Sequence, residues 1–343
     1  MQDGRFDQVS GEKIGEFHDR VRKMRRFLEK PLLGCLAWGE DCSRKPIRSH
    51  LLSESWLRRL TDNEGHVLQF VLAVEDAGKR PVGVRTALVG VGEATTFPGF
   101  CQEHDHALFA CIEREPFLAS PRQIACLVYR SVCQEISIKH QMLKCHWPVA
   151  LGPNSPACFV DFTMDQYRSL LELMNLKLRI GEMLSLDKYT IETCLVEFDK
   201  TLSVLVATTF RPNVTFTGRR LEQRMDWVTL TILPSSRGGF AVFTWDQASP
   251  KNGSLLIKSL KALPNHLVAS GILHLALEMS ENIVISPKWW ESLPKPEQER
   301  MLQRFGRGLL PGLPPLFDII CRSPEPKLDW KPFRMSFGKR GRS

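Results

Sequence analysis

The first half of the chain has the apolar spacing of helices, interrupted by two short strands. Its apolar side chains recur every three or four positions, which is the period of one face of a helix. The pattern predicts helices over residues 11–30, 53–60, 121–146 and 164–186, and a further helix that begins at Cys101. Valine-rich runs over residues 66–74 and 84–92 predict strands, the first of them entered from a polar turn.

The second half changes to short β-branched and aromatic runs separated by turn residues. Five strands are expected, over residues 193–198, 202–210, 213–216, 227–233 and 239–244. Because short turns rich in Pro, Ser and Gly join these runs, the strands should pair as an antiparallel sheet. Helices follow over residues 264–279 and 295–305, with an extended run between them. The predicted fold class is therefore α+β, with helices packed on an antiparallel sheet.

Changes in composition divide the chain into four parts. Residues 1–30 are predicted to form a basic N-terminal helix, and residues 31–150 a first domain with a helical extension. Prolines and glycines between 147 and 156 interrupt the helical pattern, which places the boundary to an α+β domain of residues 151–310 there. Residues 311–343 form a Pro-rich basic tail that we expect to wrap the surface or to be disordered.

Charge and hydropathy indicate which kinds of partner the protein can bind. The 343 residues are 43% hydrophobic and 24% charged, with a formal net charge of +8. No apolar run is long enough to cross a membrane, and the first 30 residues lack the apolar centre of a signal peptide. We therefore expect a soluble cytoplasmic protein without a membrane partner. The excess positive charge favours a polyanionic partner such as nucleic acid.

Ten cysteines without regular spacing or an export signal indicate reduced thiols rather than a disulfide framework. Five of them lie among apolar neighbours and are expected in the core: Cys126, Cys133, Cys158, Cys194 and Cys321. Cys35 and Cys42 instead flank a turn, and Cys101 and His104 lie one helical turn apart behind a Pro-Gly corner. Thiolates and an imidazole from two separate segments suit a structural zinc ion, with His106 as the alternative imidazole.

These residues resemble the treble-clef ββα arrangement of the HNH, or His-Me finger, nucleases over about residues 31–115. The resemblance rests on Cys35, Cys42, the Ser49-His50 step and the helix start from Cys101 to Asp105. It implies an N-terminal zinc-binding ββα-like region with flanking helices, in which Cys35, Cys42, Cys101 and His104 hold structural Zn²⁺.

The resemblance also implies a catalytic site. His50 matches the histidine that acts as general base after the first strand, and Asp105 or His106 falls where the family places a helix ligand for Mg²⁺ or Mn²⁺. The family usually has an acidic residue before the histidine, where this chain has Ser49. Asp105, or else Glu103 or Glu113, would therefore have to supply the carboxylate.

Hydrolysis of a phosphodiester needs a base, a divalent cation and cationic side chains that position the backbone. The leading hypothesis is an HNH-like endonuclease, more readily of DNA than of RNA, with Arg44, Lys45 and Arg48 beside the phosphates. The alternative is a non-catalytic zinc-stabilised module that binds nucleic acid or a protein, in which His50 only supports the fold.

Three other features fit an ordinary structural role as well as a functional one. Glu113 fits a solvated helix end, and Arg130 fits either a surface ion pair or a group that reaches the site. Trp289 and Trp290 suit either a stacking platform for bases or the core.

Overall fold

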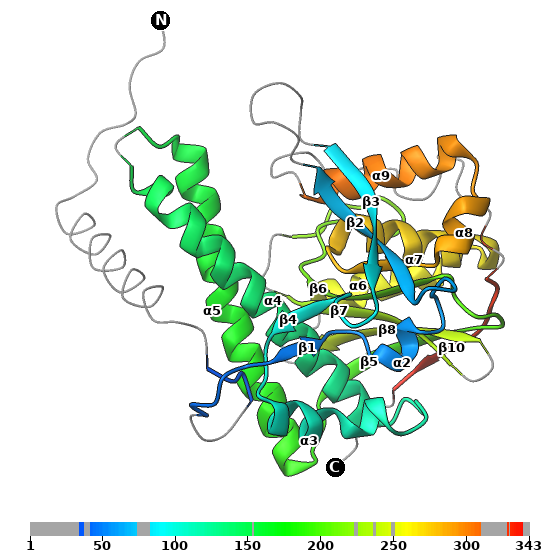
Figure 1. Cartoon of the computed structure of the whole chain (residues 1–343), viewed down its shortest axis with the longest axis horizontal. Helices are drawn as coiled ribbons and strands as arrows, with labels where there is room; N and C mark the ends of the chain where they lie inside the picture. The colour runs from blue at the N-terminus through cyan, green and yellow to red at the C-terminus, as the bar shows by residue number, and fades with distance from the viewer. Residues whose placement is uncertain are drawn as a thin grey trace, which may run out of the picture.

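The computed structural model describes residues 34–37, 42–73, 83–152, 154–222, 226–235, 238–247, 251–309, 328 and 330–338. The predicted helix over 11–30 lies outside these residues, as does Cys321. The elements in chain order are β1 (Arg48–His50), α2 (Glu54–Leu57), β2 (His66–Ala73), β3 (Gly83–Gly90), β4 (Thr96–Pro98), α3 (Gln102–Glu113), α4 (Pro121–Ala150), α5 (Ala157–Leu186), β5 (Ile191–Phe198), β6 (Val204–Phe210), β7 (Val228–Pro234), β8 (Gly239–Asp246), α6 (Lys251–Lys261), α7 (Asn265–Met279), β9 (Ile283–Ile285), α8 (Pro287–Ser292), α9 (Lys295–Leu309) and β10 (Pro332–Phe337) (Figure 1).

An eight-stranded sheet forms the centre of the molecule, and its pairings are antiparallel, as predicted. The strand order is β10-β5-β8-β7-β6-β9-β2-β3. The short strand β9 pairs with β6 on one side and with β2 on the other, so it joins the β2–β3 hairpin to the strands of the second half. The sheet therefore contains strands from both sides of the predicted boundary near residues 147–156.

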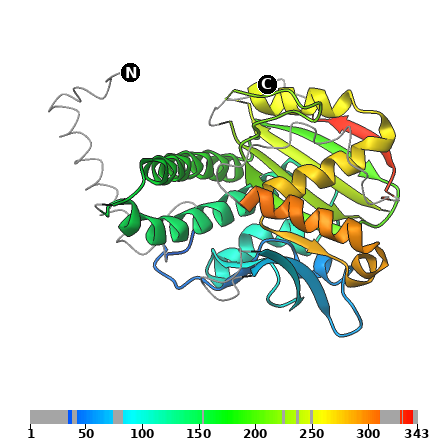
Figure 2. The ribbon, with the colours of Figure 1, turned by 90° about the horizontal axis from the view of Figure 1, so that it is seen from above.

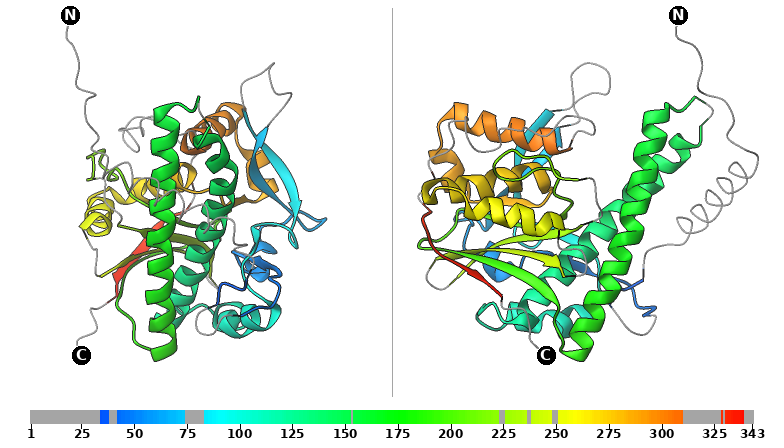
Figure 3. Two further views of the ribbon diagram at one scale, coloured as in Figure 1. Left: turned by 90° about the vertical axis from the view of Figure 1, so that its left-hand side faces the viewer. Right: turned by 180° about the vertical axis from the view of Figure 1, so that it is seen from behind.

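Helices cover both faces of this sheet (Figure 2). Helices α4 and α5 lie on one face, and α6, α7 and α9 on the other (Figures 2 and 3). In β6, Leu205 belongs to the core on the α4 side, whereas Val204 and Val206 belong to the core on the α7 side. Because both faces are covered, all seven residues of β6 and all seven of β7 are buried.

The two longest helices, α4 and α5, have 30 residues each and pack against each other as a projecting pair (Figure 3). Ser120 caps α4 through a capping box with Gln123, and Pro121 occupies the first turn. Helix α4 continues to Ala150 despite Pro148, and α5 begins at Ala157 rather than near 164. Within the described residues, no helix combines the length and apolar character needed to cross a bilayer.

Several predictions about the second half were wrong. Residues 213–216 form no strand and make only an isolated bridge between Val214 and Arg220. Helix α6 was not predicted. In the tail that was expected to wrap the surface or be disordered, β10 pairs with β5 at the edge of the sheet, where a leading proline loses no ladder hydrogen bond. Cys158 is exposed rather than buried, because the start of α5 belongs to the projecting helix pair.

Candidate metal centre

A second, two-stranded sheet and helix α3 build the candidate site. Strand β1 pairs antiparallel with β4, and His50 lies opposite Thr96. The chain then turns at Gly99 and Phe100 into α3. A Cβ atom on Gly99 would lie 2.3 Å from the Phe97 ring, so the corner requires glycine. Phe100 is fully buried under the site and contacts the Phe109 ring at 4.9 Å between centroids.

The segment around Cys35 is fixed to this corner by hydrogen bonds. The Leu36 amide donates to the Gly99 carbonyl at 2.8 Å, and the Tyr129 hydroxyl of α4 donates to the Leu36 carbonyl at 2.7 Å. The Ile47 amide donates to the Phe100 carbonyl at 2.8 Å. These bonds bring segments more than 50 residues apart in the chain together at the start of α3.

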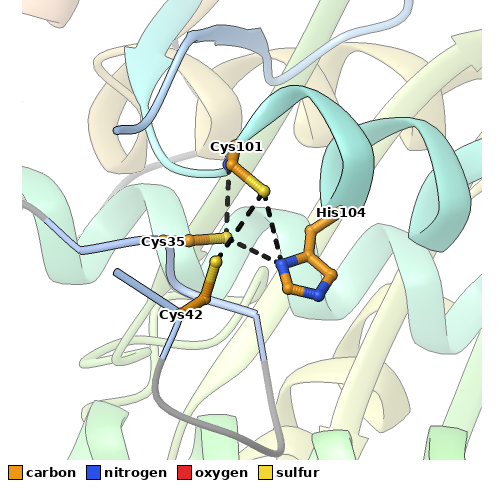
Figure 4. Close-up of side chains that lie close together, drawn as sticks. All are labelled: Cys35, Cys42, Cys101 and His104. Carbon is orange, nitrogen blue, oxygen red and sulfur yellow. Dashed lines mark hydrogen bonds between the residues drawn. The ribbon is translucent and has the colours of Figure 1, made fainter. Parts of the chain in front are cut away.

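Cys35, Cys42, Cys101 and His104 converge on one point, with their ligand atoms all within 4.8 Å of one another (Figure 4). The distances are 3.9 Å from Cys42 Sγ to Cys101 Sγ, 3.4 Å from Cys101 Sγ to His104 Nδ1 and 3.3 Å from Cys35 Sγ to His104 Nδ1. Ideal Zn–S and Zn–N bonds in a tetrahedron give edges of about 3.8 Å for S···S and about 3.6 Å for S···N. The cluster can therefore hold a metal ion such as zinc, and His104 rather than His106 supplies its imidazole.

The pKa values of two thiols of this cluster, Cys35 and Cys101, shift in opposite directions. Burial raises the pKa of Cys35. Burial acts in the same direction on Cys101, but a hydrogen bond from the His104 amide and bonds to the neighbouring thiols outweigh it and lower the pKa of Cys101. The Cys101 amide also donates to Cys35 Sγ at 3.2 Å, as N–H groups do at metal-binding sulfurs.

His50 is the last residue of β1 and is half-buried. Its Nε2 atom lies 3.0 Å from the carbonyl oxygen of Val91. A carbonyl oxygen can only accept, so Nε2 carries the proton and Nδ1 of the neutral ring is an acceptor. The histidine thus has a fixed ring orientation and one nitrogen that can take a proton.

Asp105 lies in the first turn of α3, where its negative charge is favourable. Burial raises the pKa of its carboxyl group, and nearby Glu113 acts in the same direction, while Arg130, Ser49 and His50 lower it. Ser49 therefore lies close enough to favour the carboxylate. Apart from this close approach to each other, neither Ser49 Oγ nor Asp105 Oδ1 has a hydrogen-bond partner among the described residues.

Arg130 is only 1% exposed, which rules out the surface ion pair that was one of its two expected roles. It donates from Nη2 to Glu113 Oε1 at 2.7 Å, and its guanidinium carbon lies 3.9 Å from the centroid of the Phe109 ring. Glu113 is therefore paired with a buried cation and is not a purely solvated helix end. An arginine within the apolar run of α4 was the signal in the sequence for this buried role.

The three basic residues of the predicted nucleic-acid contact are all exposed. Arg44 forms an ion pair with Glu103. Arg48 forms one with Glu93 at 3.2 Å and also donates to Thr96. Ion pairs at this exposure contribute little to stability, so both guanidinium groups can exchange their partners for phosphates.

A polar pocket of about 280 Å³ lies elsewhere, between α4, β6 and the end of α7. Lys139 pairs there with Glu135 at 3.2 Å. Burial and the neighbouring Glu135 raise the pKa of Glu281, which also lines the pocket. The pocket could not be expected from the sequence, because its walls come from segments far apart in the chain. Trp290, by contrast, is 7% exposed and packs on Phe70, which places it in the core.

No protein-family model matches the chain, and the comparisons found no matching curated protein and no matching solved structure. The case for a function therefore rests on the geometry of the site.

Proposed function

We propose that this protein is a metal-dependent HNH-like endonuclease that hydrolyses phosphodiester bonds of nucleic acid, DNA in preference to RNA, on a zinc-braced treble-clef ββα unit. One observation carries the proposal. Strands β1 and β4 and helix α3 place His50 at the end of the first strand and Asp105 in the first helical turn, next to a Cys₃His cluster. The two side chains lie near enough to interact electrostatically.

The number of zinc ligands separates the residues with a structural role from those with a catalytic role. Four protein ligands close a zinc ion to substrate, so Cys35, Cys42, Cys101 and His104 would only stabilise the fold. His50 Nδ1 would accept the proton of the attacking water, while the Val91 carbonyl keeps the ring in place. Arg44, Lys45 and Arg48 would hold the phosphate backbone.

Ser49 Oγ and Asp105 Oδ1 fit a divalent cation or its water ligands, because these buried oxygen atoms lie close together and have no other hydrogen-bond partner among the described residues. When bound, Mg²⁺ or Mn²⁺ would neutralise charge on the scissile phosphate. Asp105 would hold it. Glu113 is less suited, since Arg130 already occupies its Oε1 atom.

The test is cleavage of plasmid DNA and of single-stranded RNA by the zinc-loaded protein with Mg²⁺ or Mn²⁺. His50→Ala should abolish cleavage without changing the zinc content or the circular dichroism spectrum. His266→Ala, at an exposed position on α7 away from the site, is the matched control and should cleave normally. Cleavage by His50→Ala at the wild-type rate would refute the catalytic assignment.

A second function is supported by the hydrogen bond that already occupies His50 Nε2 and by the burial of Asp105. In this alternative the unit is a non-catalytic zinc-stabilised module that binds nucleic acid or a protein through Arg44, Lys45 and Arg48. For DNA, the module predicts salt-sensitive affinity that His50→Ala retains. Replacing the three basic residues should reduce the slope of log affinity against log salt by up to about 0.9 per lost phosphate contact.

A further inference from the structure

Helices α3 and α4 bring two thiols into contact outside the metal cluster. Cys111 lies in the last turn of α3, and Cys126 lies in the second turn of α4. Their sulfur atoms are 3.5 Å apart and share a hydrogen bond. Cys126 is fully buried, whereas Cys111 is half-buried and open to small solutes. A disulfide bond of about 2.0 Å would require the sulfurs to approach by about 1.5 Å, which an end turn of a helix can supply.

The charges around the pair favour ionisation of the more accessible thiol. Hydrogen bonding with Cys126 lowers the pKa of Cys111 to about 7, burial opposes this, and the guanidinium of Arg122 lowers it further. The same hydrogen bond, together with burial, raises the pKa of Cys126. Arg122 is held beside the pair by the Leu184 carbonyl at 3.4 Å and by Asp187 at 3.8 Å. Cys111 is also the more accessible sulfur, whereas Cys126 is buried and its Sγ donates to the Leu108 carbonyl at 3.4 Å. Cys111 is therefore the nucleophile of the pair and Cys126 its protonated partner.

We propose that Cys111 and Cys126 form a thiol-oxidation site that reacts with hydroperoxides and closes to a disulfide between α3 and α4. The Cys111 thiolate attacks one oxygen of hydrogen peroxide, which forms an S–O bond and breaks the O–O bond, and hydroxide leaves. Sulfur loses two electrons to the peroxide in this step. The Cys126 sulfur then attacks the sulfenic acid, which forms the S–S bond, breaks the S–O bond and releases water.

The disulfide would have a structural consequence for the metal centre. Helix α3 carries Cys101 and His104 at its first end and Cys111 at its last end. Closing the disulfide would tie the helix that presents two metal ligands to α4. This inference does not depend on nuclease activity, because it concerns only the packing of the two helices.

The experiment is peroxide treatment of the full-length zinc-loaded protein, followed by alkylation and non-reducing digestion with trypsin and a Glu-specific protease. Cys111 is the only cysteine of the fragment 104–113, and Cys126 is the only cysteine of the fragment 123–130. Mass spectrometry should find these two fragments joined and lighter by two hydrogens than their sum. In the untreated protein, alkylation of Cys111 by iodoacetamide should be half-maximal near pH 7.

Two variants separate the steps. Cys126→Ser should give no cross-link and should leave a sulfenic acid on Cys111 that dimedone traps. Cys111→Ser should lower oxidation of Cys126 at least tenfold, because Cys126 itself is inaccessible. Cys145, an exposed thiol of α4, is the internal control for the presence of oxidant.

Three outcomes would overturn the inference. The first is oxidation of Cys145 without any joined fragments. The second is a disulfide from Cys111 to a cysteine other than Cys126. The third is oxidation of Cys101 with release of zinc before the Cys111–Cys126 cross-link appears, which would make the metal cluster the sensitive site.

Discussion

His140 on α4 should make the stability of this protein fall in mild acid. The side chain is 3% exposed, and burial, assisted by nearby Lys144, lowers its pKa to about 4 from an ordinary value of 6.5. The folded state therefore keeps the imidazole neutral at a pH where the unfolded chain protonates it. Since the unfolded state binds more protons between these two values, acid favours unfolding there.

The magnitude follows from the difference of 2.5 between 6.5 and 4. The full loss, reached below pH 4, is about 3.4 kcal/mol in the free energy of unfolding. At pH 5.0 the loss is about 2 kcal/mol, and above pH 7 the contribution of His140 is fully retained. The sign is that of any group with a depressed folded-state pKa: stability is present above the unfolded value and disappears as the pH falls toward the folded one.

The assay is urea denaturation of wild type and His140→Gln, followed by tryptophan fluorescence, at pH 7.5, 6.0 and 5.0. Other titrating groups and any loss of zinc affect both proteins, so the quantity to compare is the difference in free energy of unfolding at each pH. That difference should shift by about 2 kcal/mol toward the variant between pH 7.5 and 5.0. His266→Gln, at an exposed position on α7, should show no such shift. A constant difference between wild type and His140→Gln would refute the reasoning.

Three further predictions concern the metal and the packing. Elemental analysis should find one zinc per chain in the wild type and in Cys133→Ser, a buried thiol outside the cluster, and none in Cys101→Ser. Glu278→Gln should cost about 3–5 kcal/mol in urea denaturation, because it leaves Arg304, 8% exposed and 2.9 Å from the carboxylate, without its buried partner. Replacing Arg304 by Met as well should recover much of that loss. Gly99→Ala should cost about 1–3 kcal/mol and weaken zinc retention against a chelator, since its Cβ would lie 2.3 Å from an aromatic ring of β4.

Local periodicity was enough to find most elements of the fold. Nine elements lie close to where the apolar spacing predicts them: the strands β2, β3, β5, β7 and β8 and the helices α3, α4, α7 and α9. The apolar spacing did not predict elements whose secondary structure depends on contacts between residues far apart in the chain. β10 is a strand because its backbone pairs with that of β5, more than 130 residues earlier, and not because of its own sequence alone.

The candidate metal ligands could be recognised from residue type, because thiols and an imidazole in turn-rich segments have few structural roles. The surroundings of the site could not. The sequence could not predict the contact between Arg130 and Glu113. Nor could it predict the hydrogen bond from His50 to Val91, which are 41 residues apart in the chain. Whether an arginine or a histidine is solvated or buried depends on which elements pack against it.

The sequence by itself determined the helical and extended segments, the antiparallel character of the sheet and the four residues of the metal cluster, since all of these depend on residue type and short-range spacing. Only the tertiary structure decided that β9 joins the β2–β3 hairpin to the main sheet, and that Cys111 contacts Cys126. It also decided that Ser49, His50 and Asp105 form one neighbourhood. The physical reason is that these arrangements are set by the packing of two helical layers on one sheet, in which each contact gains its energy from residues far apart in the chain.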